Sequence, residues 1–223
     1  TYVAKYDTTE DLKEGGTFLL NCPWSVEELD TRLTGKMKRD LARKHANFYI
    51  IDAAKLAREI GLGQHTNNIL QAAFFALTRV IPLDVAVEDM KKNNYNSYFK
   101  KAGQEIVDLN DKAVDIGISA AVKVEIPASW ADAPDTPAVV PAGASDFVKD
   151  IVLPMDHQQG DKLPVSMVDA AGRVPTGTTK YEKRGIAVMV PEWQIDNCIQ
   201  CGNCAIVCPH ACIRPYLVSE EDM

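Results

Sequence analysis

The interpretation of the whole sequence starts from one stretch near its end, Cys198-Ile199-Gln200-Cys201-Gly202-Asn203-Cys204-Ala205-Ile206-Val207-Cys208-Pro209. It spells C-x-x-C-x-x-C-x-x-x-C-P, the spacing with which bacterial ferredoxins hold a [4Fe-4S] cluster. Such a cluster needs four thiolates in one small volume, and closely spaced cysteines supply most of them at a low loop-closure entropy. The run therefore predicts metal ligands at four positions: Cys198, Cys201, Cys204 and Cys208.

Zinc and disulfide bonds are the alternative uses of these cysteines. Zinc motifs usually pair two C-x-x-C knuckles across a longer spacer, which this dense run with its trailing Pro209 does not match. All of the 6 cysteines except Cys22 lie between positions 198 and 212, so they indicate a metal site and not a disulfide scaffold. Thiolates kept for a cluster imply a reducing compartment, and we expect a cytoplasmic protein.

The fourth cysteine raises the question of how many clusters are bound. In two-cluster ferredoxins the cysteine before the proline, here Cys208, ligates the neighbouring cluster. No second run follows before Met223, so either Cys208 completes the first cluster or the partner run lies on sequence not given. We favour the second alternative and expect a piece of a longer polypeptide. Cys212 and Cys22 are expected to be buried small side chains, as free cysteines usually are.

Length and composition narrow the class of protein. With 223 residues the chain has room for one large domain and a small one, and 46% hydrophobic with 25% charged residues is typical of a soluble globular protein. The net charge of -7 argues against nucleic-acid binding, which requires basic surfaces. No apolar run approaches the roughly 18 residues of a membrane span, and residues 1–10 do not form a signal peptide.

The first half of the sequence predicts an α/β domain. Strands are expected at 17–21 and 48–51, with helices at 25–33 and 36–46 between them. Ser25 and Glu28 match a capping box at the start of the first of these helices. Strand, helix and strand within about 30 residues form a βαβ unit, so we expect part of an open parallel sheet.

More helices are expected after this unit, followed by an irregular region. The helices are predicted at 53–60 with Asp52 as its cap, at 67–80 as a deeply buried helix, at 85–92 and at 97–122. Frequent prolines then predict a linker or strap over 127–159, with Trp130 at its start and a short helix at 147–152 before Pro154. Residues 160–179 are rich in turn formers, a strand is expected at 186–190, and a small irregular domain with the cluster loop ends the sequence.

Several stretches resemble one enzyme family, pyruvate:ferredoxin (flavodoxin) oxidoreductase. They are Tyr181-Glu182-Lys183-Arg184-Gly185-Ile186-Ala187, Val190-Pro191-Glu192-Trp193, the cysteine run, and upstream 15–24, 60–63 and 124–130. The Glu-Lys-Arg triplet names a small domain in that family. The resemblance implies a partial gamma-type domain at 1–126, a linker at 127–159, a Glu-Lys-Arg domain at 160–193 and the first half of a two-cluster domain at 194–223.

The resemblance also implies an activity and its partners. The family oxidatively decarboxylates pyruvate with coenzyme A to acetyl-CoA and carbon dioxide, and electrons leave through [4Fe-4S] clusters to ferredoxin or flavodoxin. Thiamine diphosphate and magnesium would bind outside this segment, so we expect no catalytic residues in it. Its partners would be the remaining domains of the parent enzyme, which is expected to be a homodimer. The resemblance does not exclude two alternatives, a stand-alone iron–sulfur carrier or adaptor subunit and a zinc-bearing structural module.

A glycine-containing loop before the helix at 67–80 is the candidate cofactor contact. Helix N-termini attract anions, and the family's gamma-type domain is linked with coenzyme A, so a phosphate contact is expected at Gly63, Thr66 and Asn67. Ordinary helix capping explains the same residues and stays open as the alternative. The third glycine of a dinucleotide fingerprint is absent from this loop.

Overall fold

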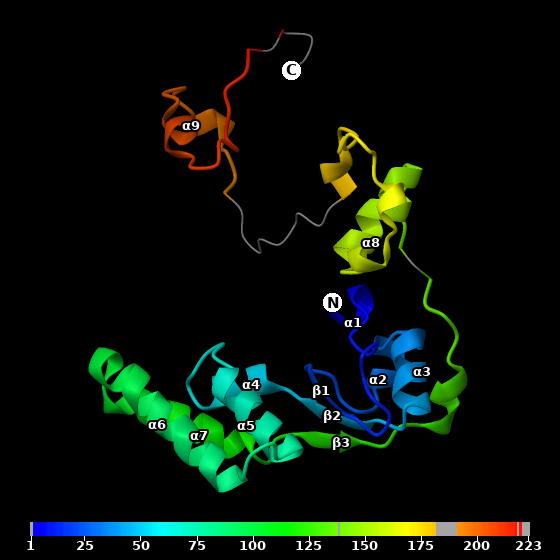
Figure 1. Cartoon of the computed structure of the whole chain (residues 1–223). Coiled ribbons are helices and arrows are strands. Elements are labelled where there is room, and N and C mark those ends of the chain that lie inside the picture. The colour runs from blue at the N-terminus through cyan, green and yellow to red at the C-terminus, as the bar shows by residue number, and fades with distance from the viewer. Residues whose placement is uncertain (1, 138, 182–190, 218, 220–223) are drawn as a thin grey trace. The chain divides into compact units, whose positions relative to one another are not determined.

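The computed structural model describes residues 2–137, 139–181, 191–217 and 219 of the chain (Figure 1). The chain divides into two compact units, Thr1–Tyr181 and Glu182–Met223, and each is described by itself. The Glu182-Lys183-Arg184 triplet and the strand expected at 186–190 lie outside the described residues.

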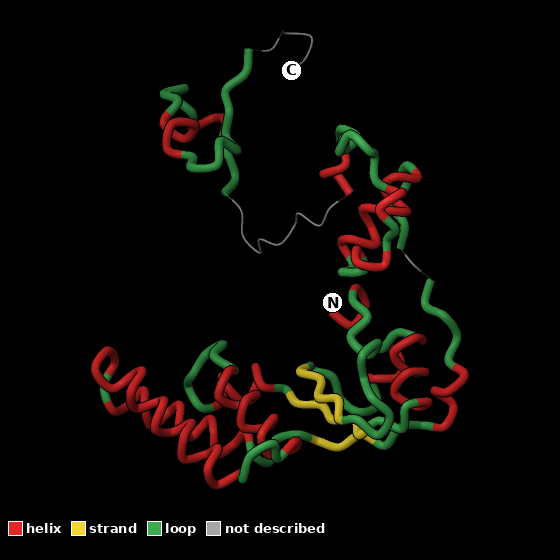
Figure 2. Tube along the Cα trace, in the orientation of Figure 1, coloured by secondary structure: helices red, strands yellow, loops and turns green. Residues whose placement is uncertain are grey.

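A three-stranded sheet lies at the centre of the first unit (Figure 2). Strands β1 (Thr17–Asn21) and β2 (Asn47–Ile51) pair in parallel, with Thr17 opposite Asn47 and Asn21 opposite Ile51. The helices between them are α2 (Leu29–Arg32) and α3 (Gly35–Arg43), so the predicted βαβ unit is confirmed. Strand β3 (Val122–Val124) runs antiparallel to β2, which corrects the expectation of a purely parallel sheet.

Polar side chains set where the first helices begin. The Glu28 carboxylate accepts a hydrogen bond from the backbone N–H of Ser25 at 2.9 Å, which is one of the two bonds of the predicted capping box. Residues 25–28 nevertheless form turns, and α2 begins only at Leu29. Asp52 caps α4 (Ala53–Glu59) as predicted, because its carboxylate accepts from the N–H of Lys55 at 2.9 Å.

Three helices pack together beyond α4. They are α5 (Asn67–Thr78), α6 (Leu83–Ala102) and α7 (Gln104–Gly117), and Figure 1 shows α6 and α7 side by side. The predicted division into helices at 85–92 and 97–122 is wrong, because the break lies at Gly103. This glycine has φ +82°, a backbone conformation that favours glycine and ends the α-helix.

Close packing decides how α5 and α7 meet. A Cβ atom on Gly117 would lie 2.4 Å from the carbonyl oxygen of Ile69, so only glycine permits this approach. Ile69 and Ala73 are fully buried, whereas Phe74 is 47% exposed. The expectation of burial on most sides of α5 is therefore only partly right.

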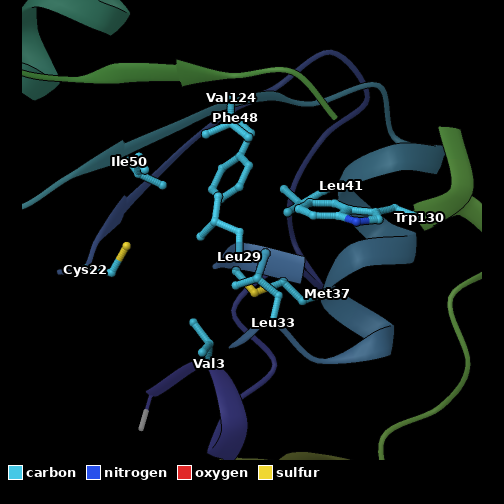
Figure 3. Close-up of a cluster of buried hydrophobic side chains, with 10 residues drawn as sticks. All are labelled: Val3, Cys22, Leu29, Leu33, Met37, Leu41, Phe48, Ile50, Val124 and Trp130. Carbon is cyan, nitrogen blue, oxygen red and sulfur yellow. The ribbon is translucent and has the colours of Figure 1, made fainter. Parts of the chain in front are cut away.

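Two main apolar clusters hold the first unit together. The first lies between the sheet and α2 and α3 and includes Phe48, Leu29, Leu41 and Trp130 (Figure 3). The second gathers side chains of β2, α4, the loop after α4, α5 and α7: Ile51, Ala53, Ala57, Leu62, Ile69, Ala73 and Ala113. Burial of these apolar surfaces is the main term that stabilises the arrangement.

The segment after β3 lies along α3. Trp130, in the 3₁₀ helix Ala128–Asp132, is buried in the first cluster. The guanidinium of Arg43 donates to the carbonyl of Ala131 at 2.9 Å, and the N–H of Gly35 donates to Oγ1 of Thr136 at 2.9 Å. These contacts fix residues 128–136, while the idea of a strap over all of 127–159 stays a prediction.

A short helix follows and passes through a proline, contrary to the expectation that it ends before Pro154. A π-helical turn (Val148–Val152) continues directly into α8 (Leu153–Asp156). The N–H of Leu153 bonds to the carbonyl of Val148, one residue further back than in an α-helix. Proline lacks an N–H and crowds the preceding turn, and the wider π-turn accommodates it.

Short elements complete the described structure. They are α1 (Tyr2–Lys5), the 3₁₀ turns Gly160–Lys162, Val165–Met167, Thr178–Tyr181 and Ile195–Asn197, and α9 (Asn203–Val207). Within the described ranges, none of the helices combines the length and apolar character that crossing a bilayer requires.

Candidate functional sites: the cysteine loop and a cavity beside α5

Backbone turns arrange the cysteine run in the second unit. The N–H of Cys198 bonds to the carbonyl of Ile195 at 3.0 Å and ends the preceding 3₁₀ turn. Gln200 and Gly202 both have positive φ, +55° and +72°, so the chain reverses between Cys198 and the start of α9. This tight turn keeps the cysteines of the run on a short, looped backbone.

Two of the sulfur atoms receive hydrogen bonds that favour the thiolate form. The backbone N–H of Gln200, followed by the Trp193 side chain, lowers the pKa of Cys198 below that of an ordinary thiol. Backbone N–H groups of Ile213, His210 and Cys212 lower the pKa of Cys208 in the same way. Thiolates are the species that bind metals, so the chemistry of these two cysteines suits iron–sulfur ligands.

The thiols of the run lie near the surface. Cys198, Cys201 and Cys204 are exposed and Cys208 is half-buried. In the described ranges, no three His, Cys, Asp or Glu side chains are gathered closely enough to hold a metal ion. Cys22 is buried as predicted, but Cys212 is exposed, because no residue of the described stretch 191–217 is buried and nothing there covers it.

A cavity of about 410 Å³ lies beside the N-terminus of α5, where the sequence predicted a cofactor contact. Gly63 and Asn67 line it, whereas Thr66 does not. Thr66 directly precedes α5 but makes no side-chain capping bond, so its hydroxyl gives no support to the capping alternative. The other lining residues are Gly61, Leu62, His65, Asn68, Tyr98, Ile106 and Asn110.

An asparagine network in the wall of this cavity was not predicted from the sequence. Nδ2 of Asn68 donates to Oδ1 of Asn94 at 3.0 Å and to Oδ1 of Asn110 at 2.7 Å. Asn94 is 1% and Asn110 6% exposed, so both amides are held in the helix packing. One feature of the sequence could have indicated a polar contact between helices. Asn94 has a low helix propensity, yet it lies in the middle of a long helix.

An α/β domain followed by a ferredoxin-type cysteine run defines a class of multidomain redox proteins. The profile of the family described as pyruvate ferredoxin/flavodoxin oxidoreductase matches residues 1–120, more than half of the chain. The chain belongs to this family. A domain of unknown function named EKR matches residues 133–187, and a 4Fe-4S binding domain matches residues 190–213.

Similar curated proteins are much longer than this chain. It is 48% identical over its whole length to the pyruvate:ferredoxin oxidoreductase of Moorella thermoacetica and 50% identical to a pyruvate-flavodoxin oxidoreductase of Enterobacter agglomerans, and covers 19% of each. It is also 42% identical to a pyruvate dehydrogenase [NADP(+)] of Cryptosporidium parvum, of which it covers 13%. The chain thus spans about a fifth or less of these relatives.

Proposed function

We propose that this chain is a segment of an enzyme that oxidatively decarboxylates pyruvate with coenzyme A. The reaction gives acetyl-CoA, carbon dioxide, a proton and two electrons, which leave through iron–sulfur clusters to ferredoxin or flavodoxin. The observation that carries the proposal is the identity of 48% to 50% with such oxidoreductases along the entire chain. This segment supplies scaffold and cluster ligands, while the thiamine diphosphate and magnesium site belongs to another part of the enzyme.

The cysteine run provides the chain's part of the electron path. When bound, a [4Fe-4S] cluster accepts and releases one electron at a time. Cys198, Cys201 and Cys204 would hold one cluster, and Cys208 would serve the neighbouring cluster. The backbone N–H groups directed at Cys198 and Cys208 support these roles, because hydrogen bonds to sulfur stabilise its negative charge.

The cavity beside α5 is our candidate for the coenzyme A contact. Gly63 and Asn67 line it at the helix N-terminus, where free N–H groups favour a phosphate, and Thr66 lies next to them. The remaining domains of the enzyme, a second copy in a homodimer, and ferredoxin or flavodoxin are the proposed macromolecular partners. Such an enzyme would operate in the cytoplasm.

Anaerobic reconstitution of the purified chain with iron and sulfide tests the ligand assignment. We expect broad visible absorption from thiolate-to-iron charge transfer, with its intensity reduced in the Cys201→Ser variant and retained in the matched Cys212→Ser control. Stoichiometric zinc without colour would contradict the assignment. Pyruvate-dependent reduction of an acceptor by this chain alone would contradict the placement of the active site on other parts of the enzyme.

A further inference from the structure

The asparagine network beside α5 has a fixed direction. At one end the carboxylate of Asp111 accepts a hydrogen bond from Nδ2 of Asn94 at 2.9 Å. A carboxylate only accepts, so Asn94 must turn its Nδ2 toward Asp111 and its Oδ1 toward Asn68. At the other end Asn110 donates through Nδ2 to the carbonyl of Ile106 at 2.8 Å, which leaves its Oδ1 for Asn68.

These two constraints determine which atom Asn68 offers to a ligand. Both N–H groups of its amide are used, one by Asn94 and one by Asn110. In the described part of the chain, Oδ1 of Asn68 accepts no hydrogen bond, and every buried side-chain nitrogen and oxygen has a partner. Oδ1 is therefore accessible, on a half-buried side chain that lines the cavity.

We propose that Asp111 and Asn94 are positioning residues that hold Asn68 as a hydrogen-bond acceptor in the cavity beside α5. The ligand class that this wall selects carries a donor, such as an amide N–H or an amine, at this point. This inference rests on the proposed function, because coenzyme A carries amide N–H groups and an amine as well as acceptor-only phosphates. In this inference Oδ1 of Asn68 accepts a hydrogen bond from an N–H group of coenzyme A, while the N-terminus of α5 binds its phosphates.

Isosteric substitutions test the direction of the network without a change of volume. Asp111→Asn allows residue 111 to donate as well as accept, so Asn94 is free to reverse and only Asn110 still orients the amide of Asn68. We expect the dissociation constant for coenzyme A, measured calorimetrically on the intact enzyme that contains this chain, to rise about 3- to 10-fold. The matched control is Asp115→Asn on the same helix, where the carboxylate pairs with Lys91 at 2.7 Å away from the cavity lining.

A rescue variant separates positioning from simple structural support. In the double variant Asn94→Asp with Asp111→Asn, residue 94 accepts from both neighbours, so Asn68 again donates both N–H groups. We expect its affinity for coenzyme A to return toward the wild-type value. Inorganic pyrophosphate, which lacks the amide and amine donors of coenzyme A, should bind Asp111→Asn at least as tightly as wild type. Thermal unfolding identifies any variant that fails to fold. If the double variant does not fold, the comparison of Asp111→Asn with Asp115→Asn still tests the positioning role.

The outcomes distinguish the two levels of the proposal. Asn68→Ala could weaken coenzyme A binding while Asp111→Asn and Asp115→Asn bind it with equal affinity. That result would overturn the positioning role but leave the cavity as the coenzyme site. Coenzyme A affinity unchanged by both Asn68→Ala and Asn67→Ala would overturn the assignment of the cavity and the positioning role together.

Discussion

The indole Nε1 of Trp130 donates a hydrogen bond to Oδ1 of Asp30 at 2.8 Å, across 100 residues of sequence. Nζ of Lys38 lies 3.0 Å from the same carboxylate oxygen and 5.9 Å from the centre of the indole ring. The contact therefore joins the segment after β3 to both helices of the βαβ unit. It also provides the polar partner that a buried indole N–H requires.

Removal of the indole N–H should change the titration of Asp30. Lys38 first and Trp130 second hold the pKa of the Asp30 carboxyl below its usual range. The stability that this carboxylate contributes is present above its unfolded pKa, about 4, and is lost as pH falls through the lower folded pKa. In Trp130→Phe we expect the pKa of Asp30 to rise toward its ordinary value, as measured by NMR titration. Trp24→Phe, in the same core, is the control and should leave this titration unchanged.

Gly35 is expected to tolerate no side chain, because the segment after β3 passes directly over it. A Cβ there would lie 1.7 Å from the carbonyl oxygen of Pro134. We expect Gly35→Ala to lower the free energy of unfolding by about 1–3 kcal/mol, as overpacking does, and to expose residues 128–136 to proteolysis. Gly160→Ala is the matched control, since its Cβ would meet Met155 at an ordinary 3.5 Å. Equal stability of the two variants would show that residues 128–136 do not pack on α3.

The sequence predicted those parts of the fold that depend on local signals. The strand at 17–21 follows two glycines, Asp52 caps the next helix, and the βαβ spacing gave the parallel pair. Gly103 and Gly117 show what local patterns miss. The helix predicted at 97–122 runs through both residues, but positive φ at Gly103 and contact of Gly117 with Ile69 are set by backbone conformation and tertiary packing. Strand β3 was missed because the same helix was predicted to continue through Val122.

The candidate sites were predictable to different degrees. The cysteine spacing alone predicts iron–sulfur ligands. The phosphate contact expected at Gly63, Thr66 and Asn67 stays a prediction, although Gly63 and Asn67 line the cavity beside α5. The pairing within the asparagine network could not be predicted, because Asn68 and Asn110 are 42 residues apart and meet only when three helices pack. Exposure of Cys212 was also mispredicted, since the burial tendency of free cysteine applies only where a core exists to receive it.

Helix α4 should depend on its capping residue. Asp52 accepts the N–H of Lys55, and α4 places the fully buried Ala53 and Ala57 in the second apolar cluster. We expect Asp52→Ala to lower the free energy of unfolding by about 1 kcal/mol in chemical denaturation. Thr66→Ala is the control, since Thr66 precedes α5 without a side-chain capping bond, and it should change stability by only a few tenths of a kcal/mol, about the error of the measurement. The reverse order of the two variants would contradict the capping assignment.

Cysteine accessibility distinguishes the two units of the chain chemically. Cys22 is 6% exposed, and burial raises the pKa of its thiol, so it is both inaccessible and protonated near neutral pH. Cys212 is exposed. In the reduced, metal-free chain we expect iodoacetamide to alkylate Cys22 about tenfold or more slowly than Cys212, as followed by mass spectrometry of peptides.

Denaturant provides the control for this comparison, because unfolding removes the burial of Cys22. In concentrated urea the two cysteines should react at similar rates, and the difference in the native state then reports the packing of Cys22 against β1, β2 and their helices. Equal native rates would contradict that packing. A slow reaction at both positions, under native conditions alone, would instead show that the exposed apolar side chains of the second unit, among them Ile199 and Ile206, associate and cover Cys212.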